Sequence, residues 1–176
     1  MERVIRPARA AVIALALVLL AAAPAAAAQP TRTKTSDSTR ISHFPAGSGC
    51  AFDVTVYRGQ DRWFTETDFS DGTIAFETHS MQRTIVNDAT GAEYHNNVVF
   101  HEVDNIDGNG IDHGSASGQF VWTFFPGDTY IDGTVLDHVV SLDMVGHATY
   151  VVNWNTGQTL QISFVGQYTD ICAAIS

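Results

Sequence analysis

An acidic, glycine-rich segment at residues 104–114 holds the side chains best suited to chemistry. Asp104, Asp107, Asn109 and Asp112 offer the carboxylate and amide oxygens that Ca²⁺ prefers, and the glycines between them would let the chain wrap around an ion. The spacing departs from the EF-hand pattern, because an apolar residue stands where an oxygen ligand belongs and no Glu closes the loop. Calcium-binding nonapeptide repeats share its Gly-x-Gly-x-Asp, but they need tandem copies. The segment predicts either a Ca²⁺ site or a plain polar loop.

Aromatic side chains form a second candidate site. In the strand expected at 119–125, alternate residues are aromatic, and alternate residues of a strand share one face. An interior of aromatic rings with a few polar tips is how apolar ligands are held, although the same stripe is typical of an ordinary solid core. The residues predicted to bind such a ligand are Phe120, Trp122, Phe124, Tyr150, Trp154 and Phe164.

No catalytic motif is present in the sequence. No serine lies in a Gly-x-Ser-x-Gly context. Asp137 and His138 are adjacent, so on a strand they would point to opposite faces. His95 and His101 would be separated by about 20 Å of extended chain, too far to share a zinc ion unless the strand bends. We therefore predict no catalytic residue and no cofactor other than a possible Ca²⁺, and leave enzymatic activity open.

The elements that position these residues are expected to be strands. Val54 and Val56 alternate with polar residues, and 159–168 shows the cleanest alternation, with Leu160, Ile162, Phe164 and Tyr168 predicted to face inward. Eight or nine short strands with short connections predict an all-β, antiparallel fold. We favour a barrel, because closure removes exposed edges, with a β-sandwich as the alternative. Further strands are expected at 63–69, 73–78, 79–86, 93–103, 139–145 and 147–154, with the longest loop at 104–117.

The N-terminus predicts export. Arginines within the first nine residues precede an apolar run from Ala10 to Ala23, and small residues follow it. This order is typical of a secretory signal peptide, and the run is shorter than the roughly 20 residues that a membrane-spanning helix needs. We expect a signal peptide over residues 1–28, a flexible polar linker over 29–48 and one β domain over 49–176.

The chain has two cysteines, Cys50 and Cys172. In an oxidising compartment such a pair is expected to form a disulfide, which would tie the first strand of the domain to its C-terminal tail. The chain-entropy model gives a loop of this length about 5 kcal/mol of stabilisation. Because the bond consumes both thiols, neither is expected to act as a nucleophile.

Acidic residues outnumber Lys and Arg by 19 to 9, and the formal net charge is −10. Such a surface repels phosphate backbones and anionic membranes, so we expect neither nucleic acid nor a membrane as a partner. The negative charge can serve only to keep the protein soluble, or it can mark a site for a cationic ligand or Ca²⁺. The sequence predicts a released, extracellular protein and leaves its oligomeric state open.

Four segments resemble a group of small secreted actinobacterial proteins. They are the opening Cys50–Val54, the aromatic Gly118–Pro126, the Gly146-His147 step and the ending Asp170–Ile175. The resemblance covers most of the mature chain and implies secretion and a disulfide-closed β domain, without implying any chemistry. The strand pattern is more distantly similar to allene oxide cyclase and dirigent-type barrels.

Three functional hypotheses follow. The first is a non-enzymatic extracellular module that binds a small apolar ligand or a protein surface. The second is a cyclase- or isomerase-like enzyme in the same fold, which would need a buried His, Glu or Asp facing a cavity. The third is Ca²⁺-dependent interaction through the acidic segment.

Overall fold

The computed structural model describes residues 29–36, 40–59, 63–78 and 81–176. The predicted signal peptide, residues 1–28, lies outside them. The described residues form one antiparallel sheet of ten strands and a short C-terminal helix, α2 (Ile171–Ala174). The strands are β1 (Thr31–Ser36), β2 (Ile41–Phe44), β3 (Val54–Arg58), β4 (Trp63–Asp68), β5 (Thr73–Thr78), β6 (Met81–Asn87), β7 (Glu93–Asn105), β8 (Ile111–Phe124), β9 (Val140–Asn153) and β10 (Gln158–Asp170).

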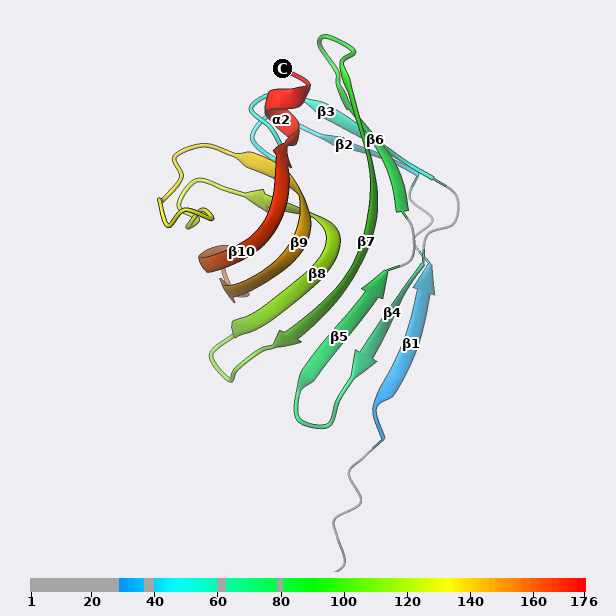
Figure 1. The fold of residues 1–176 in the computed structure, drawn as a ribbon, viewed down its shortest axis with the longest axis vertical. Helices are drawn as coiled ribbons and strands as arrows, with labels where there is room; N and C mark the ends of the chain where they lie inside the picture. Colours follow the sequence, from blue (N-terminus) through cyan, green and yellow to red (C-terminus); the bar gives the residue numbers. More distant parts are fainter. Residues whose placement is uncertain (1–28, 37–39, 60–62, 79–80) are drawn as a thin grey trace, which may run out of the picture.

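Strand β7 joins two parts of the sheet. Its N-terminal part pairs with β6, which leads on to β3 and β2, and its C-terminal part pairs with β5, which leads on to β4 and β1. Strand β8 pairs with β7 from Val99 to Val103 and then continues with β9 and β10 as a meander of long strands. In Figure 1, β8, β9 and β10 curve together, away from the upper half of β7.

A row of glycines lies across this curved part. Gly118, Gly146 and Gly166 are direct cross-strand neighbours on β8, β9 and β10. Each has a positive φ, and a Cβ at each would lie 2.2–2.3 Å from a backbone oxygen of the adjacent strand. Only glycine fits such positions, which are typical of tight bends in a sheet. In the register of the sheet, Tyr150 pairs with Gly114, which lies eight residues before Trp122. Because the strands curl, the centroids of the Trp122 and Tyr150 rings nevertheless lie only 4.7 Å apart.

The all-β, antiparallel prediction is confirmed, but the closed barrel is not, since the sheet does not close. Among the described residues, β10 pairs only with β9, and β1 and β2 pair only with β4 and β3. No helix in the described chain is long and apolar enough to cross a membrane.

Two apolar clusters stabilise the fold. The C-terminal core lies on β8, β9 and β10, with Phe124, Leu142 and Met144 fully buried. The disulfide core contains Val54, Val56, Ile85, Ile171 and Ile175, together with Cys50. The buried residues of the two cores lie on different elements. The β8–β10 part of the sheet and the β3–β6 part are therefore packed by separate apolar clusters.

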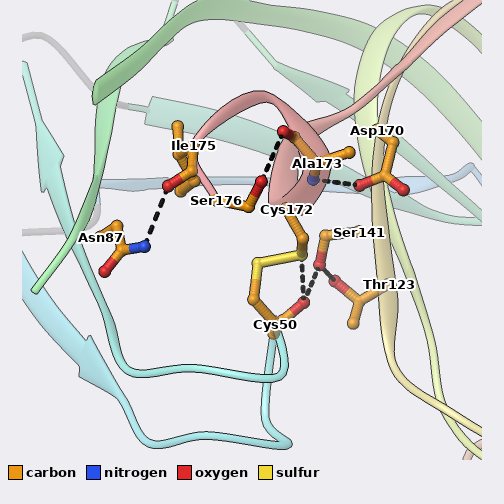
Figure 2. Close-up of a disulfide and its surroundings, with 10 residues drawn as sticks. Cys50, Asn87, Thr123, Ser141, Asp170, Cys172, Ala173, Ile175 and Ser176 are labelled. Carbon is orange, nitrogen blue, oxygen red and sulfur yellow. Dashed lines mark hydrogen bonds between the residues drawn. A yellow bond between two sulfur atoms is a disulfide. The ribbon is translucent and has the colours of Figure 1, made fainter. Parts of the chain in front are cut away.

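The predicted disulfide is confirmed between Cys50 and Cys172. It fastens α2 to the segment that precedes β3, as Figure 2 shows. Asp170 caps the helix by accepting a hydrogen bond from the Ala173 amide at 2.9 Å. The Asn87 side-chain amide donates to the Ile175 carbonyl at 2.9 Å, which ties the chain end to β6.

Several expected boundaries differ from the structure. Strands β1 and β2 occupy the segment predicted as a polar linker; every residue of β1 is exposed, so no apolar alternation marks it. The predicted loop at 104–117 is only a short turn between the end of β7 and Ile111. The Gly- and Ser-rich residues from Ile111 onward belong to β8 and pair with β9. The two strands expected at 139–145 and 147–154 are one, β9, which continues through the glycine row.

The inward alternation predicted for β10 is also interrupted. A register shift between Thr159 and Gln161 leaves Leu160 40% exposed, and Tyr168 near the other end is 49% exposed. Ile162 is buried and Phe164 packs against the C-terminal core, as expected. This register shift is a β-bulge, and it changes which side chains point to each face of the sheet. Alternation in the sequence does not reveal such a change.

Candidate functional site

A pocket of about 360 Å³ lies where β8 curls back toward β9, and we call it the acidic pocket. Three carboxyl groups and one phenol line it together with aromatic and small side chains. Its lining includes Glu102, Asp104, Asp112, Tyr150, Trp122, Trp154, Phe76, Val152 and Thr159. Within the described residues, this is where acidic side chains and aromatic rings share one pocket.

Tyr150 is positioned by a glycine. It pairs with Gly114 on the neighbouring strand, and a Cβ at Gly114 would lie 2.2 Å from the Tyr150 ring. The ring therefore lies over Gly114 and fills the space that a side chain would take. The Trp122 ring packs against it, and the indole Nε1 donates to Thr159 Oγ1 at 3.3 Å. These contacts fix the direction of the phenol.

The Tyr150 hydroxyl lies between two carboxyl groups. Its oxygen is 2.6 Å from Glu102 Oε1 and 2.7 Å from Asp104 Oδ1. A phenol carries one proton, so it can donate to only one of them, and the second short contact requires a proton on a carboxyl group. Asp112, itself buried, accepts from the Asn105 amide at 3.0 Å and is close enough to Asp104 for the two carboxyls to hydrogen-bond. The geometry thus favours a cluster that retains a proton.

Burial and mutual repulsion set the protonation of the cluster. Burial raises the pKa of Asp104 to about 7, with the nearby Glu102 and Asp112 carboxylates adding to the rise and the Tyr150 hydrogen bond opposing it. Burial also raises the pKa of Glu102. The pKa of Tyr150 is raised by burial and by both carboxylates, so the phenol stays protonated. One proton of the cluster is therefore exchangeable near neutral pH.

The pocket has an aromatic wall. Trp122 is half-buried, and Trp154 stands at the rim, 55% exposed. Phe76 reaches the pocket from β5. Tryptophan faces attract cations, and aromatic surface also accommodates apolar groups. Carboxyl groups with aromatic walls make the pocket suited to a ligand that is both apolar and positively charged.

The predicted aromatic set divides into two groups. Trp122, Tyr150 and Trp154 line the acidic pocket. Phe120 and Phe124 are buried in the C-terminal core, and Phe164 packs against that core. The structure thus brings half of the set to one pocket and places the other half in apolar packing.

The predicted Ca²⁺ ligands are also divided. Asp104 and Asp112 line the acidic pocket, whereas Asp107 and Asn109 lie in the exposed turn between β7 and β8. Asp107 accepts from the amides of Asn109 and Ile111 at 2.9 and 2.8 Å, so it stabilises the turn. In the described part of the chain, no three His, Cys, Asp or Glu side chains are placed to hold one metal ion.

Glu102 is the member of the cluster that the sequence analysis did not single out. It lies on β7 two residues after Phe100, on the face whose other residues include the buried Val98 and Asp104. A charged residue on the apolar face of a strand is the signal that would have identified it.

Comparison of the chain with protein-family models, with curated proteins and with solved structures gave no match.

Proposed function

We propose that this protein is a secreted binding module whose acidic pocket holds a small organic cation with an apolar body. The observation that carries the proposal is the Tyr150 hydroxyl held between Glu102 and Asp104 within an aromatic-walled pocket. A signal peptide, as the sequence predicts, would deliver it to the oxidising space in which the Cys50–Cys172 disulfide is stable.

Electrostatics favours a cation over the other ligand classes. Three carboxyl groups that retain one proton leave a net negative charge in the pocket, which repels anions. A purely apolar ligand would remove water from these carboxyls without replacing its hydrogen bonds, which is costly. An ammonium group supplies the opposite charge, and the indole rings of Trp122 and Trp154 can pack on its alkyl or aryl body.

Calorimetric titration with benzyltrimethylammonium tests the proposal, with benzyl alcohol as the neutral comparison. We expect the cation to bind about tenfold or more tightly than the alcohol. Its affinity should rise between pH 5.5 and 8.5, because binding competes with the proton on Asp104, whose pKa is about 7. Equal affinity for the two probes, or an affinity for the cation that does not change with pH, would contradict the proposal.

Matched variants sharpen the same titration. Asp104→Asn should weaken cation binding and remove the pH dependence near neutrality, because it eliminates the titrating group. Asp137→Asn is the control, since the Asp137 side chain is 97% exposed and bonds to the adjacent His138. The proposal expects this control to bind like the wild type.

A proton-transfer enzyme is the second candidate, and the exchangeable proton on a pocket-facing Asp104 favours it. A carboxyl with a pKa near 7 can act as acid or base at neutral pH. The test is NMR-detected deuterium exchange at the α-carbon of cyclohexanone in D₂O. This function predicts exchange above the buffer rate that is lost in Asp104→Asn; exchange at the buffer rate would count against it.

A further inference from the structure

A second, larger pocket lies on the other part of the sheet, and we call it the arginine groove. It has a volume of about 650 Å³ and is formed by β3, β6, the N-terminal part of β7 and one residue of β8. Its lining includes Arg58, Gln82, Arg83, Thr84, His95 and Asn96. It shares no lining residue with the acidic pocket.

Two arginine side chains line this groove. Arg58 and Arg83 are direct cross-strand partners on β3 and β6, and both are half-buried. Placing like charges opposite each other destabilises a sheet unless something neutralises them. The chain has only nine Lys and Arg residues and a net charge of −10, so a pair of arginines in one groove concentrates positive charge where the rest of the molecule is acidic.

Two buried hydrogen-bond donors in the groove have no acceptor. Arg83 Nε donates to Asn96 Oδ1 at 3.1 Å, but Arg83 Nη2 and Asn96 Nδ2 are buried without a partner among the described residues. Burying an unsatisfied donor costs about 1–3 kcal/mol, and such groups are rare. Both of these atoms are donors, so the missing partner is an acceptor.

Asp143, whose negative charge acts on Arg83, does not supply that acceptor. Asp143 accepts from Gln119 Nε2 at 3.0 Å and from the Tyr94 hydroxyl at 2.9 Å, and the described chain contains no ion pair between it and Arg83. Arg58 donates to Ser42 Oγ at 2.6 Å, which is a neutral partner. Among the residues that the structure describes, neither arginine forms an ion pair with a carboxylate, and the charge of Asp143 acts on Arg83 without a direct bond.

We propose that the arginine groove binds the oxyanion group of a small, hydroxyl-rich acid, with Arg58, Arg83 and Asn96 holding the anion. Guanidinium groups match the planar, two-oxygen geometry of carboxylates and also bind phosphates. A side-chain shift that opened the buried Arg83 Nη2 and Asn96 Nδ2 to the groove would let the anion oxygens give both donors an acceptor. Gln82 lines the same groove with an amide that can exchange hydrogen bonds with hydroxyl groups, as in a sugar acid or a sugar phosphate. Thr84 also lines it, but its hydroxyl hydrogen-bonds His95 Nδ1 at 3.0 Å, and His95 Nε2 lies 3.3 Å from a Glu93 carboxylate oxygen.

Titration with three hexose probes tests this inference, using glucuronate, glucose 6-phosphate and neutral glucose. Binding of either acid, with glucose about tenfold weaker or undetectable, supports the proposal. Tighter binding of glucuronate assigns the carboxylate, and tighter binding of the ester assigns the phosphate. Binding of neither acid, or equal binding of glucose, overturns the proposal.

Variants place the binding in the groove. Arg58→Gln and Arg83→Gln should each weaken acid binding about tenfold or more. Arg32→Gln, which removes an exposed residue paired with Glu77, should leave it unchanged. Wild-type affinity in both groove variants would contradict the assignment.

Asn96→Asp gives an independent readout if the arginine variants fold poorly. The new carboxylate would supply Arg83 with an internal acceptor, so this variant should lose acid binding and gain thermal stability. Unchanged binding together with unchanged stability would refute the role of Asn96. Asp104→Asn should bind the acids like the wild type, which separates this test from that of the acidic pocket.

Discussion

The acidic pocket and the arginine groove contain buried charges of opposite sign, and the two sites accommodate them differently. Around Tyr150, repulsion between carboxyls is relieved by retaining a proton, because a carboxyl can be neutralised near pH 7. Burial lowers the pKa of Arg83 only to about 10, so its guanidinium stays charged at neutral pH. The carboxyl cluster is therefore sensitive to pH, whereas the arginine pair needs a counter-ion.

The side chains of the two sites are also positioned by different apolar cores. Tyr150 belongs to the C-terminal core, and its ring direction depends on the close approach to Gly114. Arg58 and Arg83 border a small apolar hollow shared with the disulfide core, including Cys50 and Ile85. A change in one support should therefore leave the other site working, and the following variants test that separation.

The largest effect is expected from removing the disulfide. A Cys50→Ser, Cys172→Ser double variant should lose about 2–5 kcal/mol of stability, measured by urea denaturation. Glucuronate affinity should fall as the disulfide core loosens below the arginines, while benzyltrimethylammonium affinity persists in the folded protein. Equal losses of both affinities would contradict the separation.

The next effect is expected from Gly114→Ala. Its Cβ would overlap the Tyr150 ring, so the ring must move, at a cost of about 1–3 kcal/mol. Cation binding should weaken and glucuronate binding should remain. Gly108→Ala is the matched control, because a Cβ there meets nothing within 4 Å. Unchanged cation affinity in the Gly114 variant would show that the phenol direction does not matter.

A smaller effect should appear in the pH dependence of stability. The folded pKa of Asp104 is raised from 3.8 to about 7, so its protonated form stabilises the fold at low pH. That contribution is lost as the pH rises from about 4 through 7. The melting temperature should fall by a few degrees over this range and vary less in Asp104→Asn. An identical pH profile in the variant would contradict the raised pKa.

The fold was more accessible from sequence than the site. Alternation at Val54 and Val56 and the pair Cys50–Cys172 are local or compositional signals, and they predicted the antiparallel strands and the disulfide. Strand β1 was missed because an edge strand with no buried side chain leaves no alternation. The barrel was not confirmed, since closure depends on how the two edges lie in space.

Part of the acidic pocket was singled out from sequence, but with a different chemistry. Asp104 and Asp112 were predicted as Ca²⁺ ligands because they flank a glycine-rich turn. Their place beside Tyr150 depends on the register of β8 with β9 and on the bend at the glycine row. Register and curvature arise from pairing between distant residues, which a single sequence does not display.

The most direct test of the account is a carbon-13 NMR titration of the Asp104 carboxyl, with Asp104→Asn used to assign the signal. The account predicts a midpoint near pH 7 in the wild type. In Tyr150→Phe the midpoint should rise, because the hydrogen bond that lowers the Asp104 pKa is removed. A midpoint near the ordinary value of 3.8 would contradict a proton retained between these carboxyl groups.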